Sequence, residues 1–435
     1  MSIPFPEMPI LKFDGADAGT FLAKHIKRNE QDHAAAREIA ERIVEDVRKN
    51  GDAALLSYIE QFDGARLSPA GLRVGPEETE AAYQSVSAEF VEVIRRAIIR
   101  IRRFHEKQNR TGWMEPFGDG EFMGQMVRPL ASCGIYVPGG TAALASSVLM
   151  QAVPAKVAGV GRLVIATPCG KDGKVNPAIL VAAAECGIDE IYKIGGAQAI
   201  AALAFGTERI PRVDKICGPG NIYVIMAKRA VFGYVGIDSL PGPSEIVIIA
   251  DETADPRHAA ADMLSQAEHD VRAASVLITD SESLAQKVRA EIEKQTETLS
   301  RREIICGSLK NNGLIIVAPS LYDAVRLSDV LAPEHLALEV KEPLALLTRV
   351  KNAGAVFLGH YTAEPMGDYM AGPSHVLPTE TTARFFSPVS ADDFLKKTSV
   401  LYFDKPAMER LKPDVIRFAG EEKLTAHANA MGVRD

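Results

Sequence analysis

Residues 133–140 read CGIYVPGG, an apolar run that ends in a proline and two glycines. The same order, a short apolar run followed by glycines and then a helical stretch, returns as EIYKIGGAQAI at 190–200 and as DKICGPGNIYV at 214–224. Short apolar runs that alternate with helical stretches are typical of βαβ units. We therefore expect residues from about 130 to 240 to form a parallel sheet with helices on both faces.

A second region with the same alternation follows the first. Strand patterns at 245–250 and 274–279 are each followed by a helical pattern, at 256–268 and 283–299, and further strand patterns lie at 313–317 and 354–358. The first hundred residues have helical periodicity instead, and after Phe394 the chain reads as a short helical tail. The fold class expected is α/β, with two Rossmann-like parallel-sheet domains, a helical N-terminal segment and a helical C-terminal tail.

Composition excludes several classes of protein. The chain has 435 residues, of which 47% are hydrophobic and 24% charged, and its formal net charge is −8. An acidic chain without a basic block argues against a nucleic-acid partner. The longest uncharged stretch, 129–155, is interrupted by prolines and glycines, so we expect no membrane span, and the first residues show no secretory signal pattern. Five scattered cysteines without a C-x-x-C favour reduced thiols and a cytoplasmic location.

The usual phosphate-binding loops are missing. Neither G-x-G-x-x-G nor G-x-x-x-x-G-K-[ST] occurs, and H-E-x-x-H and G-x-S-x-G are also absent. The three glycine-rich segments quoted above each join an expected strand to an expected helix. Backbone amides at such helix N-termini bind anions, including a cofactor pyrophosphate, so we expect a ligand at this edge of the sheet. Tight packing of strand on helix is the alternative explanation for any one of them.

Several polar pairs could carry chemistry. Gln266 and His269 lie three apart on an expected helix, which suits two metal ligands, although a helix-end histidine beside an exposed glutamine has the same spacing. Glu334 and the adjacent His335 can activate water and move a proton, or can be a solvated loop pair.

Two further pairs lie towards the C-terminus. Asp368 and His375 occur on a loop shaped by glycines and prolines, where they fit a metal or substrate site, or a turn cap. Glu422 and His427 lie on the terminal helix and, taken alone, read as surface residues.

Taken together, these segments resemble the histidinol dehydrogenase family. The resemblance runs in order from about residue 20 to the end, through GIYVPGG, SSVLM, PAKVAGV, GGAQAIAALAFGT, DKICGPGN, GPSE, LSQAEHD, APEHLAL, GDY, HVLPT and LTAHANA. It implies an enzyme that oxidises L-histidinol through L-histidinal to L-histidine in two NAD-dependent steps, the end of histidine biosynthesis. It also implies a homodimer in which the tail is exchanged between subunits.

The resemblance assigns roles to residues by motif. It implies one zinc ion per subunit, held by Gln266, His269, Asp368 and His427. It implies an acid–base pair, Glu334 and His335, in which His335 takes the hydroxyl proton and Glu334 activates the water for the second oxidation. Substrate contacts fall on Ser244, His375 and Glu422 in addition to His335 and the zinc ligands, and NAD contacts fall on Tyr136, Gln198 and Asn221.

The expected division of the chain follows the same resemblance. Residues 1–20 form an N-terminal arm, 21–135 with 245–389 a first α/β domain, 136–244 a second domain on the cofactor side, and 390–435 a swapped tail. The chain departs from the family pattern at Ala142–Ala145 and at Ser374, which precedes His375 where the family commonly has asparagine. Two alternatives therefore stay open, a related zinc and NAD dehydrogenase of another polar alcohol such as sulfopropanediol, and a zinc-stabilised structural dimer.

Overall fold

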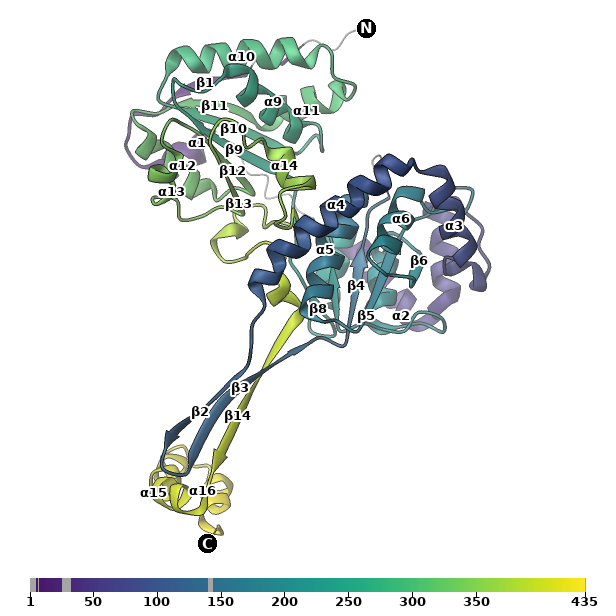
Figure 1. The fold of residues 1–435 in the computed structure, drawn as a ribbon, viewed down its shortest axis with the longest axis vertical. Helices are drawn as coiled ribbons and strands as arrows, with labels where there is room; N and C mark the ends of the chain where they lie inside the picture. The colour runs from purple at the N-terminus through teal and green to yellow at the C-terminus, as the bar shows by residue number, and fades with distance from the viewer. Residues whose placement is uncertain (1–4, 7, 26–32, 140–143, 435) are drawn as a thin grey trace.

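The computed structural model describes residues 5–6, 8–25, 33–139 and 144–434. Three sheets organise these residues, two of them parallel and one antiparallel (Figure 1). The expected fold class, with two parallel-sheet domains, is confirmed. Within the described residues, no helix is both long enough and apolar enough to cross a membrane.

The first parallel sheet has five strands in the order β6-β5-β4-β7-β8. Their bounds are β4 Ser132–Tyr136, β5 Arg162–Thr167, β6 Ile191–Lys193, β7 Lys215–Cys217 and β8 Gly236–Ile237. The helices that follow its strands are α5 Ala145–Ala158, α6 Pro177–Glu185, α7 Gly196–Phe205 and α8 Ile222–Val231. Strand order reverses direction between β4 and β7, because β5 and β6 extend to one side of β4 while β7 and β8 extend to the other.

Three N-terminal helices complete this domain. They are α2 Ala34–Phe62, α3 Pro76–Ser85 and α4 Ala88–His105. Helix α2 packs on α7 and α8, while α3 packs on α6 and α4 packs on α5, so the helices cover both faces of the sheet. By packing, these helices group with residues 132–237, whereas the division expected from sequence placed them with the other sheet. The apolar stripes of α2 and α4 predicted that they cover a sheet but carried no information about which one.

The second parallel sheet has six strands in the order β1-β11-β10-β9-β12-β13. Their bounds are β1 Ile10–Lys12, β9 Glu245–Ala250, β10 Ala274–Thr279, β11 Gly313–Val317, β12 His335–Glu339 and β13 Ala355–Leu358. Its helices are α1 Ala18–His25, α9 Pro256–Ala267, α10 Glu282–Thr296, α11 Arg302–Asn312, α12 Leu321–Leu331, α13 Pro343–Leu347 and α14 Glu364–Tyr369. Helices α9, α10 and α11 bury their apolar side chains in the core on one face of the sheet, and α1 and α12 contribute to the core on the other.

A long arm leaves the body of the molecule and carries the C-terminus (Figure 1). It consists of the antiparallel strands β2 Trp113–Gly118, β3 Glu121–Pro129 and β14 Leu395–Phe403, and it ends in α15 Lys405–Glu421 and α16 Thr425–Gly432. The expected helical tail is confirmed in α15 and α16, but a strand, β14, precedes these helices and was not expected. This strand has no buried residue, so its sequence lacks the alternation that marks a half-buried strand. The described part of the chain also contains short 3-10 helices at Pro69–Leu72, Glu106–Gln108, Thr382–Arg384 and Ala391–Phe394.

Candidate active site

The Glu334–His335 pair lies at the amino-terminal end of β12, inside the protein. Their residues are 6% and 4% exposed, so the solvated-loop alternative does not describe them. His335 Nδ1 lies 3.0 Å from the carbonyl oxygen of Glu245, at the start of the neighbouring strand β9. Glu334 Oε2 accepts a hydrogen bond from Glu245 N at 2.8 Å and lies 3.5 Å from His335 Nδ1. Two adjacent parallel strands therefore fix the orientation of both side chains.

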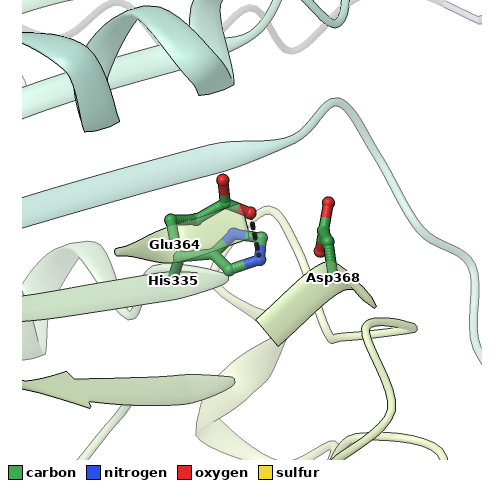
Figure 2. A group of neighbouring side chains, drawn as sticks. All are labelled: His335, Glu364 and Asp368. Atoms are coloured by element: carbon green, nitrogen blue, oxygen red, sulfur yellow. Dashed lines mark ion pairs between the residues drawn. The ribbon is translucent and has the colours of Figure 1, made fainter. Parts of the chain in front are cut away.

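Two carboxylates from α14 face the other side of the imidazole. Figure 2 shows Glu364 and Asp368 beside His335, and Glu364 Oε1 lies 3.5 Å from His335 Nε2. One ligand atom from each of these three residues lies within 4.8 Å of the others, a spacing that could hold a metal ion. Glu364 is only 2% exposed and is oriented by Ser265 Oγ, which donates to it at 3.1 Å.

Sequence reasoning missed Glu364, although a signal was available. Glu364 and Asp368 are four residues apart, which places both on one face of a helix. The segment was interpreted as a loop because of its glycines and prolines, and no such spacing rule applies to a loop. Asp368 itself is brought into the cluster, as expected.

These charges perturb one another. Burial works to lower the pKa of His335, but the carboxylates of Glu334, Glu364 and Asp368 outweigh it and raise the pKa to about 9. Burial, followed by the nearby Asp368, raises the pKa of Glu364. Strongly shifted groups clustered in this way are characteristic of functional sites. Three carboxylates around one imidazole also form an environment that is chemically suited to a cation.

Gln266 and His269 lie where α9 ends, next to this cluster. Gln266 is 1% exposed, and its Oε1 is buried without a hydrogen-bond partner in the described part of the chain. Because unpartnered buried amide oxygens are rare, this atom fits a ligand such as a metal ion. His269 follows the helix and is exposed to solvent. The C-terminus of α9 adds a partial negative charge that also favours a cation.

His375 and Ser244 border the same region from loops. The His375 imidazole lies with Nδ1 3.1 Å from the Asp368 carbonyl oxygen and Nε2 3.4 Å from Ser147 Oγ of α5. Burial lowers the pKa of His375 although Asp368 acts to raise it. Ser244 is half-buried and immediately precedes Glu245. The site therefore includes a contact between the two parallel-sheet domains.

The departures from the family pattern can be placed in part. Ser374 Oγ donates to the carbonyl oxygen of Met150 on α5 at 3.0 Å, so this serine anchors the His375 loop to the other domain. Of the Ala142–Ala145 stretch, positions 142 and 143 lie outside the described residues, and Ala145 begins α5.

Glu422 and His427 are not brought to this site within one chain. Both are exposed, His427 on α16 and Glu422 at the end of α15, at the tip of the arm away from α14 (Figure 1). Within one chain, Asp368 lies in the cluster, Gln266 and His269 lie at the end of α9, which packs on α14, and His427 lies elsewhere.

The expected cofactor residues gather at the carboxyl edge of the five-stranded sheet. Tyr136 ends β4, and its hydroxyl accepts a hydrogen bond from Gly196 N at 3.1 Å. Gln198, on the helix that Gly196 begins, is 1% exposed with its Oε1 unpartnered among the described residues. Asn221 follows β7 and is exposed. Tyr136 and Asn221 flank the point between β4 and β7 where strand order reverses, which is where open α/β sheets bind ligands.

Comparison with known proteins is consistent along the whole chain. Residues 26–435 match the family described as histidinol dehydrogenase. A histidinol dehydrogenase of Caldanaerobacter subterraneus is 57% identical over 401 residues, which cover 92% of this chain and 93% of that protein. One of Heliobacterium mobile is 51% identical over 425 residues, 98% of this chain and 99% of that protein. The crystal structure of a histidinol dehydrogenase from Elizabethkingia anophelis is similar with a TM-score of 0.92 at 37% identity, and the match covers 98% of both chains.

Proposed function

The chain belongs to the histidinol dehydrogenase family, whose members are NAD-dependent oxidoreductases, and we propose that it carries out both oxidations, L-histidinol to L-histidinal and L-histidinal to L-histidine, with zinc at the site. The observation that carries the proposal is the buried Glu334–His335 pair, held between two strands and facing the carboxylates of α14. Two oxidations require a base for the hydroxyl proton and a group that activates water, and this pair can supply both.

His335 is the base in this proposal. If its Nδ1–H donates to the Glu245 carbonyl oxygen, 3.0 Å away, then Nε2 is the basic nitrogen, on the side of Glu364 and Asp368. In the first step the neutral form of His335 takes the hydroxyl proton at Nε2, and the carboxylates that raise the pKa of His335 stabilise the imidazolium that forms. NAD supplies the hydride acceptor for both steps.

Glu334 acts in the second step. Glu245 N fixes one of its oxygens, Oε2, at 2.8 Å, so the carboxylate holds its position while its other oxygen can accept a proton from water. That water attacks the aldehyde carbon, and the aldehyde oxygen takes the proton that His335 gained in the first step, which gives the hydrate and returns His335 to its neutral form. His335 then takes the hydroxyl proton of the hydrate as the hydride passes to a second NAD. Burial of the pair keeps bulk solvent away from the reactive aldehyde.

Gln266, His269 and Asp368 are the residues of one chain that we propose as zinc ligands. The unpartnered Oε1 of Gln266 and the acidic surroundings of Asp368 support this choice. When bound, zinc would orient the substrate through its nitrogen atoms as a Lewis acid. Glu364, held by Ser265, would then lie beside the zinc ligands and help to fix the orientation of His335.

The fourth ligand, His427, is proposed to come from a second copy of the chain. Its place at the tip of the arm, away from the cluster, supports an exchange of tails, and a two-fold dimer would complete both sites at once. Large apolar side chains on the arm are exposed in the single chain and would be available for such an interface; they include Trp113, Phe117, Leu401 and Phe418.

Subunit complementation tests the shared site. We expect that mixing inactive His427→Ala with inactive His269→Ala, with exchange of subunits, restores about a quarter of wild-type activity, because half of randomly paired dimers are mixed and each has one intact site of two. A mixture of His427→Ala with Glu422→Ala is the matched control. Both lesions lie on the tail, so every site of that mixed dimer receives one and no activity returns. Failure of the first mixture, with subunit exchange verified, would exclude the exchanged tail.

The activity itself is tested by turnover of L-histidinol with NAD, with sulfopropanediol as the comparison substrate. We expect two NADH per L-histidinol, and L-histidine as the product. Preference for sulfopropanediol would assign the chain to the related polar-alcohol dehydrogenases. Zinc binding without turnover of either alcohol would favour a structural dimer.

A further inference from the structure

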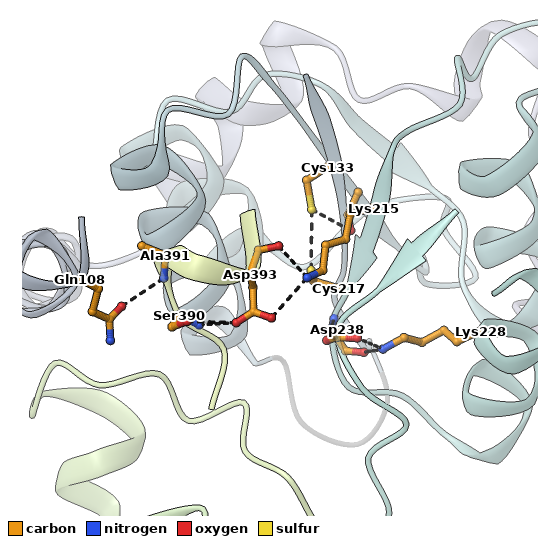
Figure 3. Close-up of polar contacts among 11 residues, drawn as sticks. Gln108, Cys133, Lys215, Cys217, Lys228, Asp238, Ser390, Ala391 and Asp393 are labelled. Atoms are coloured by element: carbon orange, nitrogen blue, oxygen red, sulfur yellow. Dashed lines mark hydrogen bonds and ion pairs between the residues drawn. The ribbon is translucent and has the colours of Figure 1, made fainter. Parts of the chain in front are cut away.

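A buried ion pair lies beneath the loop that joins β7 to α8. Lys228 of α8 is 0% exposed, and the side chain of Asp238, which directly follows β8, is 1% exposed. Figure 3 shows the two side chains facing each other, and their charged groups are in contact. Lysine and aspartate are almost never fully buried unless they are paired, and even a pair costs free energy unless the remaining hydrogen-bonding capacity is used.

Both members of the pair use that capacity on the same residue, Gly218. Asp238 Oδ2 accepts from Gly218 N at 2.7 Å, and Lys228 Nζ donates to Gly218 O at 3.1 Å. The N–H and the C=O of Gly218 are thus both hydrogen-bonded to the ion pair, and together with the Lys228–Asp238 contact they form a closed ring of charge-assisted hydrogen bonds. Such bonds are stronger than neutral ones, so they fix the loop at this residue.

Gly218 lies against Tyr136 and three residues before Asn221, and both of these residues are expected contacts of the cofactor. Gly218 has φ +122°, and a Cβ at this position would come within 2.1 Å of the Tyr136 carbonyl oxygen, so the loop approaches β4 as closely as only glycine allows. Three residues later, Asn221 caps α8, with Oδ1 accepting from Tyr223 N at 3.0 Å and Val224 N at 3.2 Å. This leaves the exposed amide group of Asn221 to donate to a ligand.

We propose that Lys228 and Asp238 are positioning residues for the dinucleotide. They hold the Gly218–Asn221 loop in its binding conformation, so that little ordering of the loop is needed when the cofactor arrives. This inference rests on the proposed placement of NAD at this edge of the sheet.

The test compares NAD binding by Lys228→Met and Asp238→Asn with binding by the wild-type enzyme. We expect the dissociation constant for NAD to rise about tenfold or more in each, the scale of one lost charge-assisted hydrogen bond. The KM for NAD should rise with it, while kcat at saturating NAD and the affinity for L-histidinol stay near wild type. Amide hydrogen exchange should accelerate at Gly218, Gly220 and Asn221.

Arg162→Met is the matched control. Arg162 pairs with Glu190 through hydrogen bonds of 2.8 and 2.6 Å at the opposite edge of the same sheet. Its loss should lower the melting temperature without changing NAD affinity. Where Lys228→Met alone does not fold, the double variant Lys228→Met/Asp238→Asn removes the unpaired buried charge and still lacks the donor to Gly218 O.

Two results separate the inference from the proposal on which it rests. Asn221→Asp keeps the helix cap but sets a negative charge towards a pyrophosphate, so it should weaken NAD binding. If Asn221→Asp weakens binding but the folded Lys228 and Asp238 variants bind NAD as wild type does, the positioning role is wrong. If Asn221→Asp also binds normally, the cofactor site is misplaced and the inference falls with it.

Discussion

Glu339, at the carboxyl end of β12, gives a prediction that depends on pH. The residue is 3% exposed, and neither carboxylate oxygen has a hydrogen-bond partner among the described residues. Burial, and then the charges of Asp262 and Asp255, raise its pKa from 4.5 to about 8. The folded protein therefore favours the protonated form over a range in which the unfolded chain is ionised.

The sign and size of the effect follow from linkage. Between pH 4.5 and pH 8 the folded state binds more protons at this site than the unfolded state, so the stability of the wild-type protein falls as pH rises through that window. At pH 7 the pH is about 2.5 units above the ordinary pKa of a glutamate. At 1.36 kcal/mol per unit, the loss in the free energy of unfolding is at most about 3 kcal/mol. Above pH 8 the penalty no longer grows.

Glu339→Gln removes the titrating group and keeps the size of the side chain. We expect the variant to unfold at a higher temperature than wild type at pH 7 and 8, and to show little advantage at pH 5. Scanning calorimetry at pH 5, 6, 7 and 8 measures this, with Glu342→Gln as the control because Glu342 is exposed and only three residues away. A difference between Glu339→Gln and wild type that stays constant across this pH range would refute the reasoning.

Three further predictions concern the site. Glu334→Gln keeps an acceptor for Glu245 N but cannot activate water, so oxidation of L-histidinal should fall about 10²-fold or more, while oxidation of L-histidinol should fall less. Single-turnover formation of NADH from each substrate measures the two losses. Equal losses would show that Glu334 has another role. Removal of zinc by a strong chelator should abolish turnover and added zinc should restore it, and full activity in a preparation shown by elemental analysis to be metal-free would contradict the proposed ligands. Ser147→Ala removes the hydroxyl 3.4 Å from His375 Nε2, so kcat/KM for L-histidinol should fall several-fold, about the value of one hydrogen bond, with the KM for NAD unchanged; a rise in the KM for NAD alone would move Ser147 to the cofactor side.

The sequence predicted most of the strands that are buried on both faces, but it missed β12, which is buried along its whole length, and it missed the exposed strands of the arm. Runs such as Glu245–Ala250 and Ala274–Thr279 are recovered at the same bounds, because a continuous apolar run of this length has few other structures available. Strand β2 is exposed along its whole length, and β3 has one buried residue. Strand β3 pairs with β2 on one side and with β14, far away in sequence, on the other. These strands are therefore identified by their pairing in the structure, because their sequences show no periodic pattern of buried residues.

The motifs named candidate site residues one by one, but they did not indicate how these residues assemble. The motifs located Glu334, His335 and Asp368, and they could not indicate that a strand start and a helix bring these residues within contact of Glu364. The position of His427 away from the cluster is equally invisible in the sequence. Its distance along the chain from Gln266 is large whether the tail folds back or reaches another subunit.

The relation between the two sheets explains why neither domain holds the whole site. His335 begins a strand and Gln266 ends the helix that returns from β9, so the proposed substrate site lies at the amino edge of the six-stranded sheet. Tyr136, Gln198 and Asn221 lie at the carboxyl edge of the five-stranded sheet. The first turn of α5 begins at that carboxyl edge, and its Ser147 contacts His375. The amino edge of one sheet therefore meets the carboxyl edge of the other, which is the arrangement that the proposed hydride transfer between a substrate on one domain and NAD on the other requires.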